Sequence, residues 1–181
     1  MLARVQSYLL QGIDALPCEI EIDLDNRSFN KDTIVGLPDA AVKESLERVK
    51  AAMSNRGYSL PQGRLLVNLA PADVRKEGPA YDLPIAIGML AVQGVVGLPV
   101  KGGNEGLDLR QYLLAGELAL DGRLRPIKGA IALASLARTQ GVRGVILPAE
   151  NALEAALVPG VEAIGVATLA EVVGIVRGEL E

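Results

Sequence analysis

Few residues of this chain carry the side chains that most enzymes use for catalysis. Its 181 residues include no histidine and one cysteine, Cys18. The absence of histidine excludes imidazole bases and Ser-His or Cys-His nucleophile pairs. A lone cysteine can form neither an internal disulfide nor a thiolate zinc site, and it fits the reducing environment of the cytoplasm. We expect Cys18 to be a small core residue rather than a reactive thiol.

A row of carboxylates is the arrangement best suited to a hard cation. Glu19, Glu21 and Asp23 alternate with apolar residues, so they lie on one face of a predicted strand and could share a Mg²⁺ ion. Three carboxylates without neighbouring ligands bind such ions weakly, and a solvated face explains the same pattern. The sequence therefore predicts no metal site.

Basic residues gather in two predicted turns, where contact with a phosphate backbone is feasible. The first turn holds Arg75 and Lys76, and the second holds Arg123, Arg125 and Lys128. The whole chain carries 18 basic and 22 acidic residues, a net charge of −4, so nucleic acid could be attracted only locally. Ordinary solvated turns explain these residues equally well, and both interpretations remain open.

Motifs for nucleotide binding are missing. The chain has no Gly-x-x-x-x-Gly-Lys-[Ser/Thr] run, and its glycine-rich segment 102–106 has no following Lys-Ser/Thr or helix start that could hold phosphates. We therefore expect this chain to bind neither ATP nor another cofactor by itself.

The elements that must position these residues begin with a sheet. Residues 16–25 alternate between apolar and mostly acidic side chains, which predicts a half-buried strand. Residues 3–10 are expected to form its partner, residues 33–37 a short third strand, and residues 64–70 a further strand.

Helical periodicity replaces this alternation after Pro38. An apolar stripe recurs at helical spacing, and charged residues, Arg48 among them, fall outside it. The stripe consists of Val42, Leu46, Val49 and Met53. Pro38 suits the first turn of the predicted helix, and Gly57 supplies its stop.

The most apolar stretch, residues 83–100, is the candidate for a membrane span. Pro84, Gly88 and further glycines and prolines interrupt it, so a continuous helix is too short to cross about 30 Å of hydrocarbon. We expect a helix buried in the core and no membrane association. Asp82 is expected to be its N-cap, where accepting backbone N–H bonds stabilises a helix by about 1 kcal/mol.

Strands and helices alternate through the rest of the chain. We expect residues 112–118 to turn through Asp121-Gly122 into 123–126 as a hairpin. Helices are predicted at 129–140, 149–157 and 168–177, and strands at 144–147 and 161–165. The pattern predicts a mixed α/β (α+β) sheet packed against helices, with residues 1–181 forming a single domain without repeats or linkers.

Three ordered motifs resemble one protein family. They are residues 36–45, residues 76–86, and Gly116-Glu117-Leu118 followed by Gly122 and residues 125–129. Together they resemble the N-terminal domain of the YifB/ComM proteins, bacterial AAA+ ATPases related to the magnesium-chelatase I subunit. They also look like a diverged copy of the Lon protease proteolytic domain, which implies a ribosomal protein S5 domain 2-like fold. The resemblance marks Gly78, Pro79, Asp82, Pro84, Gly116 and Glu117 as motif positions.

The Lon resemblance implies a chemical test, since that protease activates a serine with a lysine rather than a histidine. The position that matches the serine is Ala80, and the position that matches the lysine falls, without gaps, on Ile131. Both members of the dyad are thus absent, and we expect no catalytic residue. A hydrolase that has rebuilt its site around Lys76, Asp82 or Ser135 is the alternative.

The resemblance implies a role beside an AAA+ motor that this chain does not contain. We expect a non-catalytic accessory domain that supports assembly and DNA handling, such as branch migration during natural transformation. ATP and Mg²⁺ would bind the motor module. The resemblance also implies self-association in a ring, such as a hexamer, in the cytoplasm.

Overall fold

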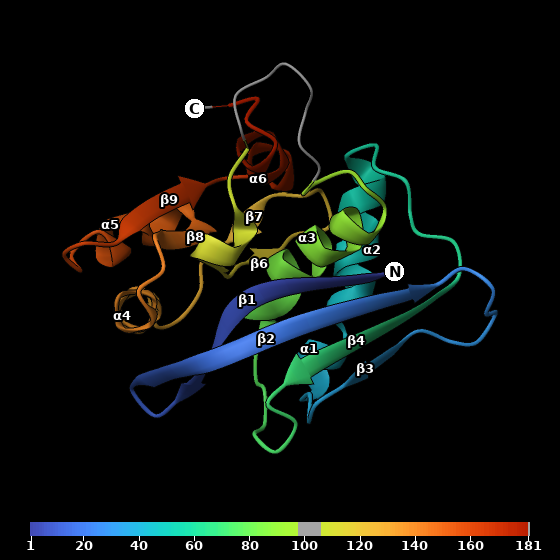
Figure 1. Ribbon diagram of the computed structural model, residues 1–181, viewed down its shortest axis with the longest axis horizontal. Coiled ribbons are helices and arrows are strands. Elements are labelled where there is room, and N and C mark those ends of the chain that lie inside the picture. The colour runs from blue at the N-terminus through green and yellow to red at the C-terminus, as the bar shows by residue number, and fades with distance from the viewer. Residues whose placement is uncertain (98–105, 181) are drawn as a thin grey trace.

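A mixed sheet and a parallel sheet organise the chain, for which the computed structural model describes residues 1–97 and 106–180. The mixed sheet has the strand order β1-β2-β4-β3, the parallel sheet has the order β5-β8-β9, and β6 and β7 form a separate hairpin (Figure 1). This arrangement confirms the predicted α/β class with a mixed sheet. The glycine-rich segment at 102–106 lies, apart from Gly106, outside the described residues.

The mixed sheet is built on a long antiparallel pair. Strands β1 (Leu2–Gln11) and β2 (Asp14–Asp25) pair along their whole length, and β4 (Arg64–Ala70) pairs antiparallel with β2. The short β3 (Thr33–Val35) runs parallel to β4. The alternation predicted for β2 is confirmed, because its apolar side chains from Cys18 onward are buried while the acidic ones are partly or fully exposed.

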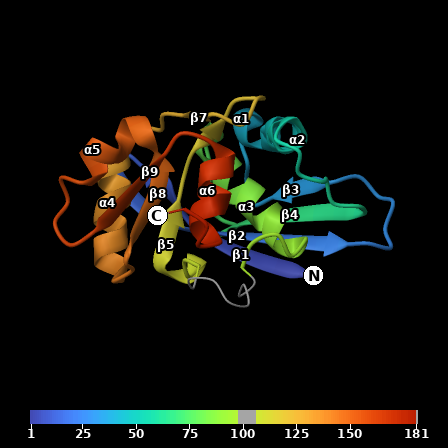
Figure 2. The same ribbon diagram turned by 90° about the horizontal axis from the view of Figure 1, so that it is seen from above.

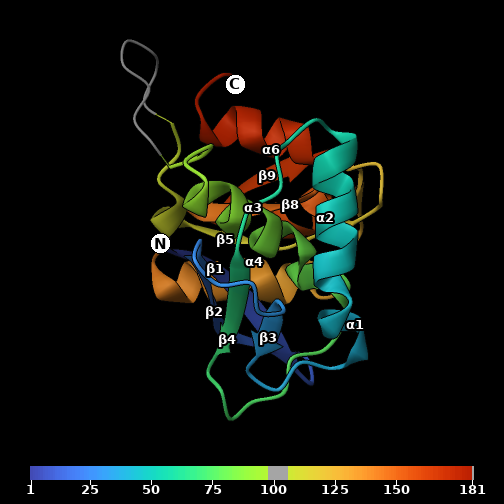
Figure 3. The same cartoon turned by 90° about the vertical axis from the view of Figure 1, so that its right-hand side faces the viewer.

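Helices α1 (Ala40–Lys43), α2 (Ser45–Asn55) and α3 (Asp82–Val92) lie against this sheet, with α2 packed on α3 (Figure 3). The prediction of one helix starting at Pro38 is wrong, since the helix is divided at Glu44. Asp39 caps α1 by accepting from the backbone N–H of Val42 at 2.8 Å, while Pro38 forms a bridge with Lys76. The predicted stripe itself is buried throughout.

The parallel sheet contains β5 (Tyr112–Leu114), β8 (Gly144–Pro148) and β9 (Glu162–Val166). Helices α4 (Ala130–Gln140), α5 (Ala152–Ala155) and α6 (Leu169–Val176) accompany it, as do two short 3-10 turns, η2 (Leu109–Gln111) and η3 (Ala149–Asn151), whereas a third 3-10 turn, η1 (Pro79–Tyr81), leads into α3. This half, with α4 and α5, lies at one end of the molecule, and β3 and β4 lie at the other (Figure 2).

The hairpin predicted for residues 112–126 is confirmed only near its turn. Strands β6 (Glu117–Leu118) and β7 (Leu124–Arg125) pair antiparallel, but β5 pairs with β8 instead. The reason lies between β5 and β6, where Gly116 donates its backbone N–H to Ala80 and accepts from Leu83, at 2.8 and 3.0 Å. This contact turns the chain from the parallel sheet toward α3.

Helix α3 is the centre of the core. Ten of its eleven residues are buried, and Gly88 faces Ile22 so closely that an added Cβ would clash with that side chain. Within the described part of the chain, no helix combines the length and apolar character needed to cross a membrane.

Candidate functional site

A cleft of about 420 Å³ lies where β1, the β4–α3 connection and the β6–β7 hairpin meet. We call it the Ala80 cleft. It is lined by Tyr8, Leu10, Asp39, Glu77, Gly78, Pro79, Ala80, Tyr81, Glu117, Pro126, Ile127 and Lys128. Three of the marked motif positions, Gly78, Pro79 and Glu117, thus meet in one place with Ala80, the expected nucleophile position.

The cleft does not bring the two positions of the expected dyad together. Ala80 lines it, but Ile131 is 48% exposed on α4 and is not among the lining residues. The residues of α4 that are buried in the cluster against which Ala80 packs are apolar, namely Ala130, Leu133, Ala134, Leu136 and Ala137. A shift of register along α4 would therefore place no amine against Ala80.

Lys76 is not available to phosphates, and the prediction that placed it in a solvated turn is wrong. Its side chain is fully buried, and its ammonium donates to the carbonyls of Gly36, at 2.8 Å, and Pro71. Burial lowers the pKa of this amine. Lys76 thereby fastens the β4–α3 connection to the end of β3, a structural role.

Cys18 lies near enough to Lys76 for the two groups to interact electrostatically, but it does not form a nucleophile. The side chain is completely buried in β2. Desolvation raises the pKa of the thiol from 9.0 to about 12, although the charge of Lys76 lowers it. At neutral pH the sulfur is a protonated thiol without access to a substrate.

Asp82 is not the N-cap of α3, contrary to the prediction. It is the first residue of the helix, and it makes no capping bond to the helix itself. The first N–H groups of α3 bind backbone carbonyls instead, those of Pro79 and Gly116, while Pro84 has no N–H to satisfy. The helix start therefore needs no side-chain cap.

The carboxylate of Asp82 is instead half of a buried ion pair. It accepts from Arg48 Nε at 2.7 Å and Nη2 at 3.0 Å, and from the backbone N–H of Leu118 at 3.0 Å. Arg48 also donates to the carbonyl of Ala41 at 2.8 Å. Burial raises the pKa of Asp82, and the bonds from Arg48 and Leu118 oppose that rise.

Sequence reasoning missed Arg48, which it placed among the outward charged residues of the helix. Its side chain is only 19% exposed, and the bond to Asp82 raises the pKa of its guanidinium. The signal that could have found it is the need of any buried carboxylate for a counter-charge. Spacing along the helix does not say which basic residue provides it.

Two glycines of the motifs shape the walls of the cleft. Gly78 has φ +82° and donates its N–H to the carboxylate of Asp39 at 3.1 Å. At Gly116 an added Cβ would lie 2.9 Å from Leu124 Cδ2. Both positions are thus explained by backbone geometry.

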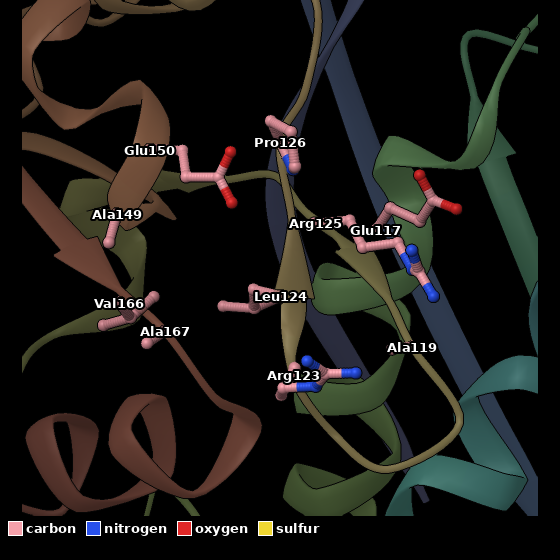
Figure 4. Close-up of a pocket in the computed structure, with 10 residues that line it drawn as sticks. All are labelled: Glu117, Ala119, Arg123, Leu124, Arg125, Pro126, Ala149, Glu150, Val166 and Ala167. Atoms are coloured by element: carbon pink, nitrogen blue, oxygen red, sulfur yellow. The ribbon is translucent and has the colours of Figure 1, made fainter.

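A second cavity, of about 600 Å³, adjoins the Ala80 cleft and shares Glu117 and Pro126 with it. Figure 4 shows Arg123 and Arg125 on the β6–β7 hairpin and Glu150 across the cavity from Arg125. The remaining lining residues are Ala119, Leu124, Ala149, Val166 and Ala167.

The predicted basic residues divide into two groups. Arg123, Arg125 and Lys128 are exposed around the β6–β7 hairpin, where Arg123 pairs with the carboxylate of Asp121 at 2.8 Å. Arg75 is exposed beside Glu77, at 3.6 Å. Ser135, named in the hydrolase alternative, is exposed on α4 and lines neither cavity.

The acidic row on β2 is occupied by ordinary surface interactions. Glu19 and Glu21 both face Arg4, at 3.9 and 3.2 Å, and Asn68 donates to Glu21 at 2.9 Å. Asp23 lies 3.6 Å from the amino group of the first residue. Within the residues that the structure describes, no group of three or more potential ligands could hold a metal ion.

The sequence of this chain is similar to those of known proteins from one family. A family model described as subunit ChlI of Mg-chelatase matches residues 20–151. The protein YifB of Salmonella typhimurium is 41% identical over 150 residues, and competence protein ComM of Haemophilus influenzae is 40% identical over 150 residues; each match covers 83% of this chain. The chain spans 28% of the length of each of these relatives.

A more distant similarity extends to a protease. The Lon protease of Halothermothrix orenii is 27% identical over 156 residues, which cover 82% of this chain and 18% of the protease.

The ion pair between Arg48 and Asp82 makes a first prediction. We expect Asp82→Ala or Arg48→Ala to lower the free energy of unfolding by about 3–5 kcal/mol, because each leaves the other charge buried without its partner. The double variant Arg48→Met/Asp82→Leu should lower the free energy of unfolding by much less than the sum of the two single losses. Denaturant unfolding measures both effects.

Arg110→Ala is the matched control, because it removes an arginine from an exposed pair with Asp108 and should leave stability unchanged. A small loss in both single variants at Arg48 and Asp82 would contradict the assignment of a buried ion pair.

The buried thiol makes a second prediction. Native Cys18 should not react with a thiol reagent at neutral pH, and it should react at once when the chain is unfolded in guanidinium. The pKa of the thiol is 9.0 in its ordinary state and about 12 in the native chain. At a pH between these two values, the unfolded chain has lost the thiol proton and the native chain keeps it. The native state should therefore lose stability as pH rises through this window.

The variant Cys18→Ala lacks this contribution, so the stability difference between it and the wild type should shrink as pH rises. Rapid labelling of the native thiol would show instead that Cys18 is accessible and ionised.

Proposed function

Because this chain belongs to the family of subunit ChlI of Mg-chelatase, together with the YifB and ComM proteins, we propose that it is a non-catalytic domain that supports the assembly of an AAA+ ATPase. The ATPase module, with its ATP and Mg²⁺, would lie in the part of such a protein that this chain does not cover. The observation that carries the proposal is a protease-like cleft lined by an alanine where a nucleophile would stand.

The finer fold assignment is part of this proposal. A ribosomal protein S5 domain 2-like fold of the Lon proteolytic type is supported by the 27% identity to a Lon protease and by the mixed sheet with α3 against it. A ring such as a hexamer, in the cytoplasm, is the assembly that this resemblance favours.

The hydrolase alternative has weaker support from the side chains that it needs. The amine of Lys76 and the carboxylate of Asp82 are both buried and hydrogen-bonded. Ser135 lies outside both cavities, so a substrate held in the Ala80 cleft would not meet it. The phenol of Tyr81, beside Ala80, has a pKa raised by burial and stays protonated.

A contribution to DNA handling is supported by the surface of the β6–β7 hairpin. Arg123, Arg125 and Lys128 are exposed together there, and ComM bears the name of a competence protein. Arg75 could add a contact beside the cleft, whereas Lys76 could not.

The absence of peptidase activity is the third prediction. The chain should release no product above the blank from fluorogenic casein or a small peptide ester. Ala80→Ser should be equally inactive, because the buried side chains of α4 that pack near Ala80 are apolar, and Lys128, whose amine lines the cleft, is exposed to solvent, where a lysine keeps its proton at neutral pH. Turnover that disappears in Ser135→Ala would establish the hydrolase alternative.

DNA binding is the fourth prediction. At low salt, fluorescence anisotropy should detect binding to branched or single-stranded DNA, and Arg123→Ala/Arg125→Ala/Lys128→Ala should weaken it. Each phosphate contact contributes roughly 0.7–0.9 to the slope of log affinity against log salt, so the triple variant should lower that slope by about 2–3.

A matched triple variant removes three exposed arginines elsewhere on the surface, Arg110, Arg138 and Arg143. Equal weakening by this control, or no binding at low salt, would refute the role of the hairpin.

A further inference from the structure

We propose that the loop carrying Phe29 in one copy of this chain docks into the Ala80 cleft of a second copy, head to tail. The loop comprises residues 26–32, between β2 and β3, and we call it the Phe29 loop. This inference rests on the proposed assembly role and names the surfaces that would mediate it.

Phe29 is the chain's single phenylalanine, and its side chain is fully exposed. The base of the loop is firmly held, because Asp32 pairs with Lys50 and accepts from the backbone N–H of Leu65 at 2.8 Å. Within the loop, Asn30 donates its N–H to Ser28 Oγ at 3.2 Å. The phenyl ring is therefore presented to solvent on an ordered support, as an aromatic anchor at an interface would be.

The Ala80 cleft has the chemistry to receive such a ring. Its apolar lining includes Leu10, Pro79, Ala80, Pro126 and Ile127. Its volume of about 420 Å³ falls in the range of pockets that enclose small ligands. The methyl group of Ala80 leaves room where a larger side chain would fill the space.

The charges around the two surfaces are complementary. Arg27 and Lys31 are exposed on either side of Phe29, and no ion pair engages them among the described residues. The cleft is lined by the carboxylates of Asp39, Glu77 and Glu117 against the single ammonium of Lys128. Arg75, beside Glu77, and Arg125, the cross-strand partner of Glu117, lie next to the cleft but do not line it. Such complementarity sets the orientation and partner of a contact.

The two surfaces cannot meet within one molecule. Strand β2 begins at Asp14, paired with Gln11 next to the cleft residue Leu10, and ends at Asp25, where the Phe29 loop starts. A strand of this length spans about 35–40 Å. The loop after β2 and the turn between β1 and β2 lie at opposite ends of the molecule (Figure 1).

A contact between unlike surfaces at opposite ends is heterologous. Repeated from copy to copy, it closes into a ring when the rotation permits, and otherwise extends into a filament. A second copy of this chain is therefore the occupant that both surfaces fit.

The test is complementation between two variants, measured by sedimentation velocity over a series of concentrations. Phe29→Ala removes the anchor and keeps the cleft, while Ala80→Phe fills the cleft and keeps the anchor. Wild-type chain should self-associate, and each variant alone should associate about tenfold more weakly or not at all. An equimolar mixture should form a dimer that does not extend further, because only one productive contact remains.

Leu153→Ala is the control, since it removes an equally prominent exposed side chain from α5 that lines neither cavity. A charge reversal avoids any folding defect from Ala80→Phe. Glu77→Lys should weaken association, and Arg27→Glu in the partner copy should restore it.

Several results would overturn the proposal. They are a monomeric wild type at about 1 mM, undiminished association of Phe29→Ala, or single variants that fail to complement each other. Binding of labelled oligothymidine that depends on Phe29, without self-association, would assign the loop to nucleic acid instead. These outcomes are independent of the peptidase and hairpin experiments, so failure of the docking contact and failure of the proposed function are distinguishable.

Discussion

A single buried carboxylate constrains the centre of this molecule. Asp82 begins the most apolar helix, and its charge can be kept there only with a partner and a full set of hydrogen bonds. Arg48 and the N–H of Leu118 supply them, which brings α2 and β6 to the start of α3. Since η1 precedes α3 and β6 leads into the hairpin, the same interaction holds two walls of the Ala80 cleft. The shape of the cleft follows from the burial of this charge and needs no catalytic explanation.

Backbone geometry likewise explains the residue types at several motif positions. Gly78 adopts a positive φ, Gly116 admits a close approach of Leu124, and Lys76 ties two loops through their carbonyls. Each residue would be required whether or not the cleft contained a nucleophile. Sequence similarity to a Lon protease can therefore extend over most of the chain although Ala80 offers no nucleophile. The motif depends on the backbone of this segment, whereas catalysis would depend on a side chain. The motif can therefore be present without the catalytic group.

The sequence predicted local structure well and long-range partnership poorly. Alternation in β2 and the apolar stripe of α2 are local periodicities, and both are confirmed in the burial of their side chains. The roles of Asp82, Arg48 and Lys76 depend on residues 34, 34 and 40 positions away, a separation that no pattern within one element records. The division of 112–118 between two sheets has the same cause, since Gly116 is bound by a segment from the other half of the chain. Ala80, which is local to its motif, lines the cleft, whereas Ile131, whose position required a tertiary alignment, does not.

The net charge of −4 does not show that positive and negative side chains gather on separate surfaces. Cations lie within the Phe29 loop and around the β6–β7 hairpin, whereas carboxylates line the Ala80 cleft. The hairpin forms the wall between the two cavities, because Glu117 and Pro126 line both. An occupant of the Ala80 cleft would thus rest against the strand pair that carries Arg123 and Arg125. Since β6 and β7 are two residues long and joined by a short turn, a shift of Glu117 would move its paired residue Arg125 as well. The proposed assembly contact at the cleft and the proposed anion contacts at the hairpin would then meet in one short element.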